Sequence, residues 1–247
     1  MPSCITEQPL ETLAADAKSY WSQSAARPWV ADMSHWRGRG RWADDTVWTS
    51  IGRDHVALFH QLCLLSARTT PIRTMLEWGP GGGANALAFA PIAPRIYGVD
   101  ISAANLQECS RQLSQSNFRA FHPIEIEAAQ PERVLAAVNE PLDFALSTAV
   151  FQHFPSKQYG QRVLNILHRL LAPDGIALIQ TRFDDGSETL RCKTSDYAKN
   201  VVTFTSYRIE EFWDNCMQAG FHPLSLTLKP EPAYAYYFLQ KHPNPGT

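Results

Sequence analysis

The segment from 76 to 90, LEWGPGGGANALAFA, combines an acidic residue with a glycine-rich run and residues that suit a helix. Glu77 stands two residues before Gly79, and three more glycines follow. Glycines between a strand and a helix let a ligand lie against the backbone, where N–H groups and the positive helix end are available. The pattern therefore suits a nucleotide-like cofactor, although GPGGGA also fits the G-x-G-x-x-A fingerprint of dinucleotide-binding proteins.

A second carboxylate accompanies the glycines. Asp100 closes the run RIYGVD, which we expect to be the next strand. A carboxylate in that place can accept hydrogen bonds from both ribose hydroxyls of an adenosine. The absence of G-K-[ST] after the glycines excludes a triphosphate loop. A nicotinamide dinucleotide remains the main alternative, but an acid two residues before the first glycine is unusual for it, and no second substrate domain is evident.

The pattern E-x-G-x-G-x-G followed by Asp100 resembles the first two motifs of the class I S-adenosylmethionine-dependent methyltransferases. The resemblance covers roughly residues 71 to 239 and includes the LLAPDG turn. It implies that Glu77 lies near the methionine ammonium and that Asp100 holds the ribose. The other contacts that it implies are Gly79, Gly81 and Gly83 along the methionine and ribose, Ile101 over the adenine, Glu127 and Ala128 near its amino group, and Ser147 at the methionine end. The Asp that the family usually has near Glu127 is missing here.

Candidate catalytic residues follow the fourth predicted strand in the segment STAVFQHFP. Methyl transfer from a sulfonium is an in-line displacement that needs alignment, desolvation and a deprotonated acceptor. Because the unperturbed pKa of histidine is near ~6.5, His153 is the candidate base, unless its ring only hydrogen-bonds the loop. Gln152 and Tyr20 complete the candidate catalytic set, and Phe151 is expected to contact the substrate.

The N-terminal segment SHWRGRGRW is the candidate lid over the substrate. Arg37 or Arg41 could pair with a carboxylate, and Trp36 and its neighbouring tryptophans could present aromatic faces to a sulfonium. The alternative is that most of these rings only pack an additional N-terminal layer. Tyr234, on a predicted edge strand, is a further candidate for substrate contact. RNA binding by the arginines and glycines is disfavoured, because no extended basic surface accompanies them.

Metal binding is not predicted. His55, His60 and Cys63 lie on one predicted helix at spacings of five and three, which is a poor metal constellation. Asp184 and Asp185 follow the fifth predicted strand, where some oxygen-methylating relatives hold a metal, but no third ligand is evident and a turn is the simpler interpretation.

Composition limits the partners. The 247 residues include 22 Lys plus Arg and 24 Asp plus Glu, and the net charge of -2 gives no overall attraction to nucleic acid or to an anionic membrane. Neither a secretion signal nor an apolar run of the ~20 residues that a membrane span requires is present. Five cysteines without a C-x-x-C motif argue against a disulfide framework and a zinc site. We therefore expect a cytoplasmic protein that acts on a small molecule.

The elements that must position these residues alternate between strand and helix from residue 71 onward, which indicates βαβ units and a mostly parallel sheet. The expected strands are 72–78, 95–100, 121–127, 142–147, 175–182, 224–230 and 234–241, with the last two antiparallel. The expected helices of this part are 84–90, 102–115, 131–138, 157–171 and 207–220. The resemblance implies a Rossmann-like α/β fold, with a seven-stranded sheet and helices on both faces.

Two further segments complete the expected organisation. Residues 5–22 and a helix from Asp44 or Asp45 to about Ser66, with an irregular segment between them, form an N-terminal helical lid (1–70) before the cofactor-binding domain (71–247). The polar connection 183–207 is expected to be a functional lid or a mobile segment because of its length.

Three functions fit this sequence. The first is methyl transfer from S-adenosylmethionine to a small metabolite in secondary metabolism. In the second, the amine of S-adenosylmethionine attacks the carbon attached to its own sulfur, which yields methylthioadenosine and azetidine-2-carboxylate; the chain loosely resembles natural-product enzymes among which such cyclases occur. The third is binding of S-adenosylmethionine without catalysis. The sequence gives no oligomeric state.

Overall fold

Seven strands form one sheet in the order β3-β2-β1-β4-β5-β7-β6 in a computed structural model that describes residues 8–241. The first five strands are parallel, and β7 runs antiparallel between β5 and β6. The strands are β1 Thr74–Trp78, β2 Arg95–Asp100, β3 Phe121–Glu125, β4 Leu142–Ser147, β5 Leu171–Arg182, β6 Phe221–Lys229 and β7 Tyr234–Lys241. This arrangement confirms the predicted fold class.

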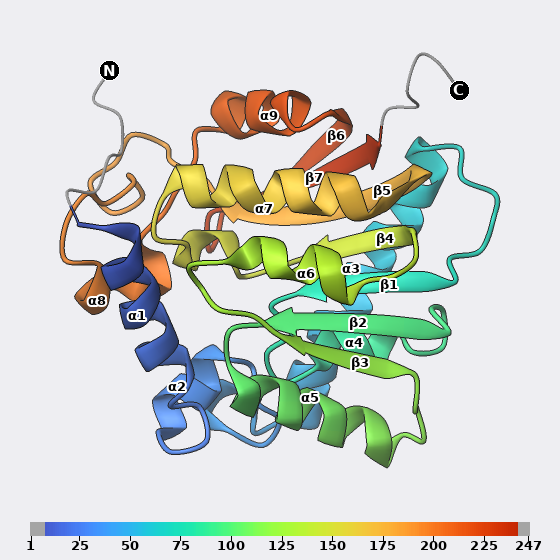
Figure 1. Ribbon diagram of the computed structural model, residues 1–247, viewed down its shortest axis with the longest axis horizontal. Coiled ribbons are helices and arrows are strands. Elements are labelled where there is room, and N and C mark those ends of the chain that lie inside the picture. Colours follow the sequence, from blue (N-terminus) through green and yellow to red (C-terminus); the bar gives the residue numbers. More distant parts are fainter. Residues whose placement is uncertain (1–7, 242–247) are drawn as a thin grey trace.

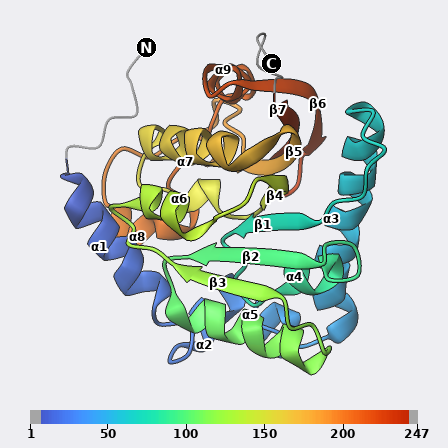
Figure 2. The same cartoon turned by 45° about the vertical axis from the view of Figure 1, so that its right-hand side comes forward.

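Helices cover both faces of the sheet (Figures 1 and 2). The α-helices are α1 Leu10–Trp21, α2 Pro28–Met33, α3 Asp45–Leu65, α4 Ala84–Phe89, α5 Ala103–Gln115, α6 Val134–Ala137, α7 Lys157–Leu170, α8 Tyr197–Asn200 and α9 Ile209–Gln218. The 3-10 turns are η1 Gly40–Trp42, η2 Pro131–Arg133, η3 Phe151–His153 and η4 Val201–Thr203.

Alternation along the buried strands creates two apolar layers, because successive side chains of a strand point to opposite faces. In β1, Leu76 packs with α6, α7 and α9, whereas Met75 packs with α3, α4 and α5. Figure 1 shows α6 and α7 in front of the sheet, with α3 and α4 behind it. The predicted helices and strands therefore pack as the resemblance implies.

Three stretches differ from the prediction. The expected irregular segment after α1 contains α2, which starts at Pro28, a residue that suits the first helical position. The LAPDG turn lies inside β5, because Leu171 pairs with Leu142 while the next paired residue of β5, Ile176, faces Phe144. Residues 183–207 contain α8 and η4, and Arg182 fastens them by donating to Thr203 O at 3.1 Å.

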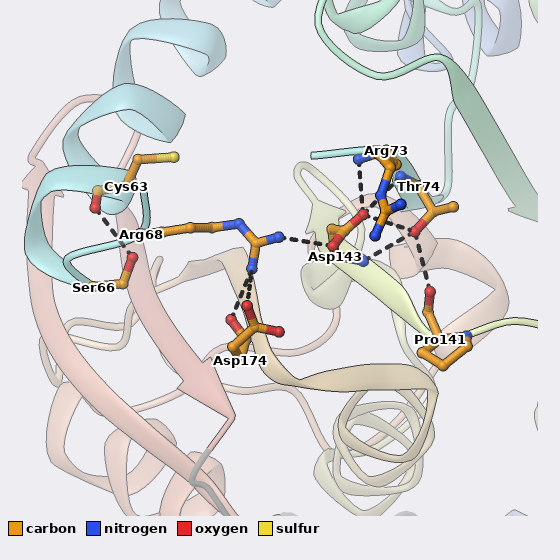
Figure 3. Close-up of polar contacts among 8 residues, drawn as sticks. All are labelled: Cys63, Ser66, Arg68, Arg73, Thr74, Pro141, Asp143 and Asp174. Atoms are coloured by element: carbon orange, nitrogen blue, oxygen red, sulfur yellow. Dashed lines mark hydrogen bonds and ion pairs between the residues drawn. The ribbon is translucent and has the colours of Figure 1, made fainter. Parts of the chain in front are cut away.

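The C-terminal end of α3 is tied to the sheet by Arg68 (Figure 3). The Arg68 guanidinium is buried and donates to Asp143 Oδ1 at 2.7 Å and to Asp174 O at 3.0 Å. Asp143 Oδ2 also accepts from the backbone N–H groups of Arg73 and Thr74, at 2.7 and 3.0 Å. Phe59 of α3 packs in the same apolar layer as β1 and β4. We therefore use the name cap only for residues 10–42, and we treat α3 together with the sheet.

Candidate functional site

A cavity lies between the cap and the carboxyl ends of the parallel strands, the edge where open α/β sheets bind their ligands. Figure 1 shows α1, α2 and α8 at this edge. The space that no protein atom fills, including its opening to solvent, is about 760 Å³. The glycine loop after β1 and the segments after β2 and β4 line it from the sheet side, while α1, Met33, Ser34 and His35 line it from the cap.

The glycine loop lies directly against the backbone of the cap. Gly82 N donates to Ser34 O at 2.7 Å. A Cβ atom at Gly82 would lie 2.3 Å from His35 O, and one at Gly81 would lie 2.5 Å from Ser34 O. Gly79 and Gly81 also line the cavity and take positive φ values of 79° and 51°. Gly81 and Gly82 are therefore needed for the close approach of the cap.

Asp100, the last residue of β2, lines the cavity. One carboxylate oxygen accepts from Ser102 N at 2.8 Å, and the other lies 3.4 Å from Asn105 Nδ2. Burial raises the pKa of Asp100 to about 6, against these stabilising hydrogen bonds. Trp36 of the cap donates its indole N–H to Asn105 Oδ1 at 3.0 Å. A carboxylate with this environment can accept hydrogen bonds from the hydroxyl groups of a ligand.

Glu77 lies one layer behind the cavity wall. Its Oε1 accepts from Asn85 Nδ2 at 2.8 Å, and its buried Oε2 has no hydrogen-bond partner among the described residues. Burial raises the pKa of Glu77 to about 8. Asn85 Nδ2 also donates to Thr148 Oγ1 at 3.0 Å, and Thr148 lines the cavity. This cluster places a carboxyl group and a hydroxyl group near one end of the cavity.

His153 faces the cavity from η3, and its ring lies 4.8 Å from the Trp21 ring of the cap. Its Nδ1 is buried without a hydrogen-bond partner among the described residues. Burial lowers the pKa of His153 to about 4, so the ring is neutral at pH 7. A neutral imidazole on the cavity wall can accept a hydrogen bond or a proton from a ligand that reaches one of its ring nitrogens.

The structure brings six of the predicted site residues together along the cavity wall. These are Gly79, Gly81, Asp100, Ile101, Ala128 and His153. Glu77 is linked to the cavity through Asn85 and Thr148. The glycine motif, the end of β2 and the segment after β4 therefore meet at one place, although they are far apart in the sequence.

Four predicted cofactor or catalytic residues lie away from the cavity, which corrects their expected positions. Gly83 backs onto Cys109, with an added Cβ only 3.0 Å from its sulfur. Glu127 is exposed and pairs with Arg133 at 3.0 Å. Ser147 is buried and donates to Trp78 O at 3.2 Å. Gln152 is buried, and its backbone carbonyl accepts from Thr205 N at 3.0 Å.

Three predicted aromatic residues are also misplaced by the sequence reasoning. The fully buried Phe151 ring packs against Phe154, Tyr207 and Phe212 rather than facing a substrate. Tyr20 packs edge-to-face on Trp21 and Trp29. Tyr234 of β7 pairs with Arg182 of β5, and its ring packs in the apolar layer that contains α3. Their apolar surface is used in packing, which sequence patterns do not distinguish from ligand contact.

The predicted lid residues are engaged with their own neighbours. Arg37 forms a bidentate ion pair with Asp45, with N–O distances of 2.7 and 2.6 Å. Arg41 pairs with Asp32 at 3.0 Å. Trp36 does not line the cavity and instead donates to Asn105. The expectation that these arginines receive a substrate carboxylate is therefore wrong for this conformation.

The described residues contain no group of three or more metal-binding side chains, and His55, His60 and Cys63 do not form one. Asp184 and Asp185 accept from Gly186 N and Ser187 N at 2.8 and 2.9 Å, as in a turn. None of the helices within residues 8–241 has the length and apolar character that a bilayer crossing requires.

Three of the described cysteines, Cys63, Cys109 and Cys216, are free. An odd number of cysteines at wide spacings argues against a framework of several bridges but does not exclude a single one. The cytoplasmic location therefore stays a prediction.

Sequence reasoning missed several polar residues of the site, among them His35, Asn85, Thr148 and Tyr197. His35 lines the cavity with a positive φ of 56°, a conformation that is uncommon for a residue with a side chain. Tyr197 lines the cavity from α8 and donates to His153 O at 2.7 Å. Asn85 comes shortly after the glycines and Thr148 directly after β4, so their places in the sequence could have indicated a role in the site. The place of His35 in the cap could not.

Comparisons with known proteins agree with this geometry. Residues 50–226 match the family model described as "Methyltransferase domain". No curated protein shows significant sequence similarity to the chain. An S-adenosylmethionine-dependent methyltransferase from Clostridium acetobutylicum has a similar structure, at 10% identity and a TM-score of 0.59 over 74% of this chain and 89% of that one.

Two further solved structures have the same fold. The N-methyltransferase NodS from Bradyrhizobium japonicum, in complex with S-adenosylhomocysteine, is 12% identical, with a TM-score of 0.55 over 74% of this chain and 84% of NodS. A structure concerned with conversion of a disulfide into a thioacetal during echinomycin biosynthesis is 15% identical, with a TM-score of 0.52 over 74% and 82% of the two chains. Since the family model spans more than half of the sequence, the chain belongs to the class I S-adenosylmethionine-dependent methyltransferases.

Proposed function

We propose that this protein transfers the methyl group of S-adenosylmethionine to a small-molecule acceptor of secondary metabolism. The observation that carries the proposal is a single cavity lined by the glycine loop, the Asp100 carboxylate and the neutral His153 ring, under an aromatic cap. The cofactor supplies an electrophilic methyl group on a sulfonium. The fold that the chain shares with the protein of the echinomycin biosynthesis structure supports the choice of secondary metabolism.

The lining residues suggest how the cofactor is held. Asp100 would accept from the ribose hydroxyls, and Ile101 and Ala128 would flank the adenine. Gly79 and Gly81 would lie along the methionine part, toward Thr148. This orientation places the sulfonium near the Trp21–His153 end of the cavity. There Trp21 presents a ring to the positive charge, and the cap excludes water.

His153 is our candidate for the group that receives the acceptor's proton. As the acceptor's lone pair forms its bond to the methyl carbon, the electrons of the carbon–sulfur bond remain on sulfur. The acceptor's N–H or O–H proton would pass to the neutral His153 ring on the cavity wall, which later releases it to solvent. A neutral ring is the competent form, which agrees with the lowered pKa.

The cavity favours an uncharged acceptor. No lysine or arginine of the described residues lines it, and the ionisable lining side chains are Asp100, His35, His153, Tyr159 and Tyr197. Burial lowers the pKa of both histidines to about 4 and raises the pKa of both tyrosines. At pH 7 these four are neutral, so an acceptor carboxylate or phosphate would lack a partner. We also propose that the N-terminal lid, predicted over residues 1–70, is limited to the cap and that α3 belongs with the cofactor-binding domain.

Conversion of S-adenosylmethionine to azetidine-2-carboxylate is a second candidate, favoured by the direct docking of the cap on the glycine loop. A cap in this position encloses the cofactor between aromatic and neutral walls, which suits a reaction of the cofactor with itself. The amine nitrogen would bond to the carbon attached to sulfur, that carbon–sulfur bond would break, and the amine proton would leave through His153. The sulfur product would be methylthioadenosine.

One incubation separates these functions. The protein is supplied with S-adenosylmethionine alone and then with pooled small phenols, alcohols and amines, and the nucleoside product is identified by mass spectrometry. We expect S-adenosylhomocysteine only after the acceptors are added. Methylthioadenosine without an acceptor would favour the cyclase, and saturable binding without any product would favour a non-catalytic binding module.

A further inference from the structure

His55 lies on α3, outside the cavity, yet it is connected to the cavity wall. Its Nδ1 is 2.7 Å from Asn85 Oδ1. Asn85 Nδ2 in turn donates to Glu77 Oε1 at 2.8 Å and to Thr148 Oγ1 at 3.0 Å. All four side chains are buried, and only that of Thr148 reaches the cavity. Three hydrogen bonds thus link a helix behind the sheet to one end of the site.

The available donors and acceptors determine which group donates in each hydrogen bond of this network. Asn85 uses both hydrogens of its amide nitrogen on Glu77 and Thr148, so its buried oxygen needs a donor. His55 supplies that donor only when Nδ1 carries the hydrogen, which selects one tautomer of the neutral ring. Without His55, the Asn85 oxygen would be buried and unpaired, and the orientation of the amide would no longer be fixed.

The packing around His55 holds its ring in place. Gly52, one turn earlier in α3, allows the close approach to α4, since a Cβ there would lie 2.5 Å from Ala84 O and 2.4 Å from Ala88 Cβ. On another side, the ring of Tyr236 is 5.7 Å from the His55 ring. His60 lies further along the same helix and is exposed. The sequence therefore provides a matched histidine that lacks the network.

The network leaves one donor free on the cavity wall, at Thr148, and one acceptor free just behind that wall, at Glu77. Glu77 Oε2 is buried without a hydrogen-bond partner among the described residues. Thr148 Oγ1 accepts from Asn85, so its own hydrogen remains available to a ligand. An acceptor beside a donor matches the ammonium and carboxylate groups of an α-amino acid.

We propose that His55 is a positioning residue that acts through Asn85 to orient Glu77 and Thr148 toward the amino-acid end of the cofactor. This inference rests on the proposed function, because it needs the methionine part of S-adenosylmethionine at that end of the cavity. His55 itself touches neither the cofactor nor the acceptor.

Two nucleosides test the inference. S-adenosylhomocysteine carries the amino-acid end, whereas 5′-methylthioadenosine shares the adenosine and the sulfur but lacks it. Their dissociation constants are measured by isothermal titration calorimetry for the wild type, His55→Ala, His55→Asn and His60→Ala. We expect His55→Ala to weaken S-adenosylhomocysteine about fivefold to tenfold, the effect of one hydrogen bond, and to leave methylthioadenosine within about twofold.

The remaining variants distinguish positioning from folding. His55→Asn keeps an N–H near the position of Nδ1 and should restore most of the affinity, while His60→Ala should change neither ligand. If His55→Ala does not fold, Thr148→Val tests the cavity end of the network without altering α3, and it should weaken S-adenosylhomocysteine selectively. Equal losses for both nucleosides, or unchanged binding of S-adenosylhomocysteine, would overturn the inference. A wild type that binds neither nucleoside would overturn the proposed function itself, and the inference with it.

Discussion

The buried Glu77 and the half-buried Asp100 lie near the carboxyl ends of neighbouring strands, and the surroundings of both disfavour a charged carboxylate. Burial raises the pKa of Glu77 to about 8 and that of Asp100 to about 6. Asp100 is compensated by several hydrogen bonds, while one oxygen of Glu77 has no partner among the described residues. A cationic ligand group near Glu77 would favour its charged form, so ligand binding and ionisation are coupled at this site.

Glu77→Gln is predicted to stabilise the ligand-free protein at pH 8. Burial raises the pKa of this group from its ordinary value of 4.5 to about 8, so the folded state binds the proton more tightly than the unfolded state does. Stability therefore falls as the pH rises from about 4.5 to about 8. The full shift corresponds to roughly 5 kcal/mol as an upper bound. Chemical denaturation at several pH values should show the advantage of the variant at pH 8 and its loss toward pH 5. The exposed Glu188→Gln serves as the control, and an advantage independent of pH would contradict the assignment.

Asp100→Ala should weaken the binding of S-adenosylhomocysteine by about ten- to a hundredfold, the effect of losing hydrogen bonds to a charged group. Isothermal titration calorimetry at pH 8, where this carboxyl is ionised, measures the change. Glu127→Ala is the matched control, because the exposed Glu127 pairs with Arg133 away from the cavity. Equal affinity for Asp100→Ala and the wild type would remove the ribose assignment.

Among the elements, the cap and the glycine loop form the most consequential contact. Their backbones touch through Gly82 N and Ser34 O, and indole N–H groups fasten the same segment: Trp48 donates to His35 O at 2.7 Å and Trp36 to Asn105. Ser102 Oγ, which caps α5, donates to Trp21 O at 2.9 Å. The cap therefore depends on the elements that hold the cofactor.

Gly82→Ala should release the cap from the glycine loop. Gly82 has an ordinary φ, so alanine suits its backbone, but the added Cβ would lie 2.3 Å from His35 O. We expect faster hydrogen exchange in residues 10–36, with the sheet unchanged, and weaker binding of S-adenosylhomocysteine. Gly186→Ala is the control for the loss of a glycine elsewhere in the chain. Its positive φ strains an alanine locally, but an added Cβ there has nothing within 4 Å, so the cap should not be affected. Unchanged exchange in the cap of Gly82→Ala would show that this contact does not hold it.

The elements were more predictable from the sequence than the side chains that complete the site. Strand β2 and strand β4 have the predicted bounds because alternation and burial reinforce each other there. Asp100 and Gly79 were predictable because their roles depend on local position after a strand. His35 was not, because its place in the cavity depends on how the cap folds back over residues distant in sequence. The arginines of the cap were misjudged for a local reason: Asp45 and Asp32, eight and nine residues away in the sequence, pair with Arg37 and Arg41.

At the scale of the whole molecule, the fold indicates the cofactor and the cap helps to determine which acceptor fits. The sheet order and the family match assign the chain to the methyltransferases. Because the identity to the solved structures is low, the class of methyl acceptor has to be inferred from the cap and the cavity of this chain. A cavity whose lining is neutral apart from Asp100 should discriminate between uncharged and negatively charged acceptors.

Among accepted substrates, neutral phenols, alcohols or amines should therefore be methylated in preference to analogues that carry an added carboxylate, as measured by kcat/KM. A preference for the acidic analogues would contradict the proposed acceptor class.

The central claim is that the cavity under the cap binds S-adenosylmethionine in one orientation. A crystal structure with S-adenosylhomocysteine tests it most directly. The account predicts ribose hydroxyls on Asp100, the homocysteine end beside Thr148 and the sulfur on the side of Trp21 and His153. An empty cavity, the reverse orientation, or a nicotinamide dinucleotide in the same place would contradict it.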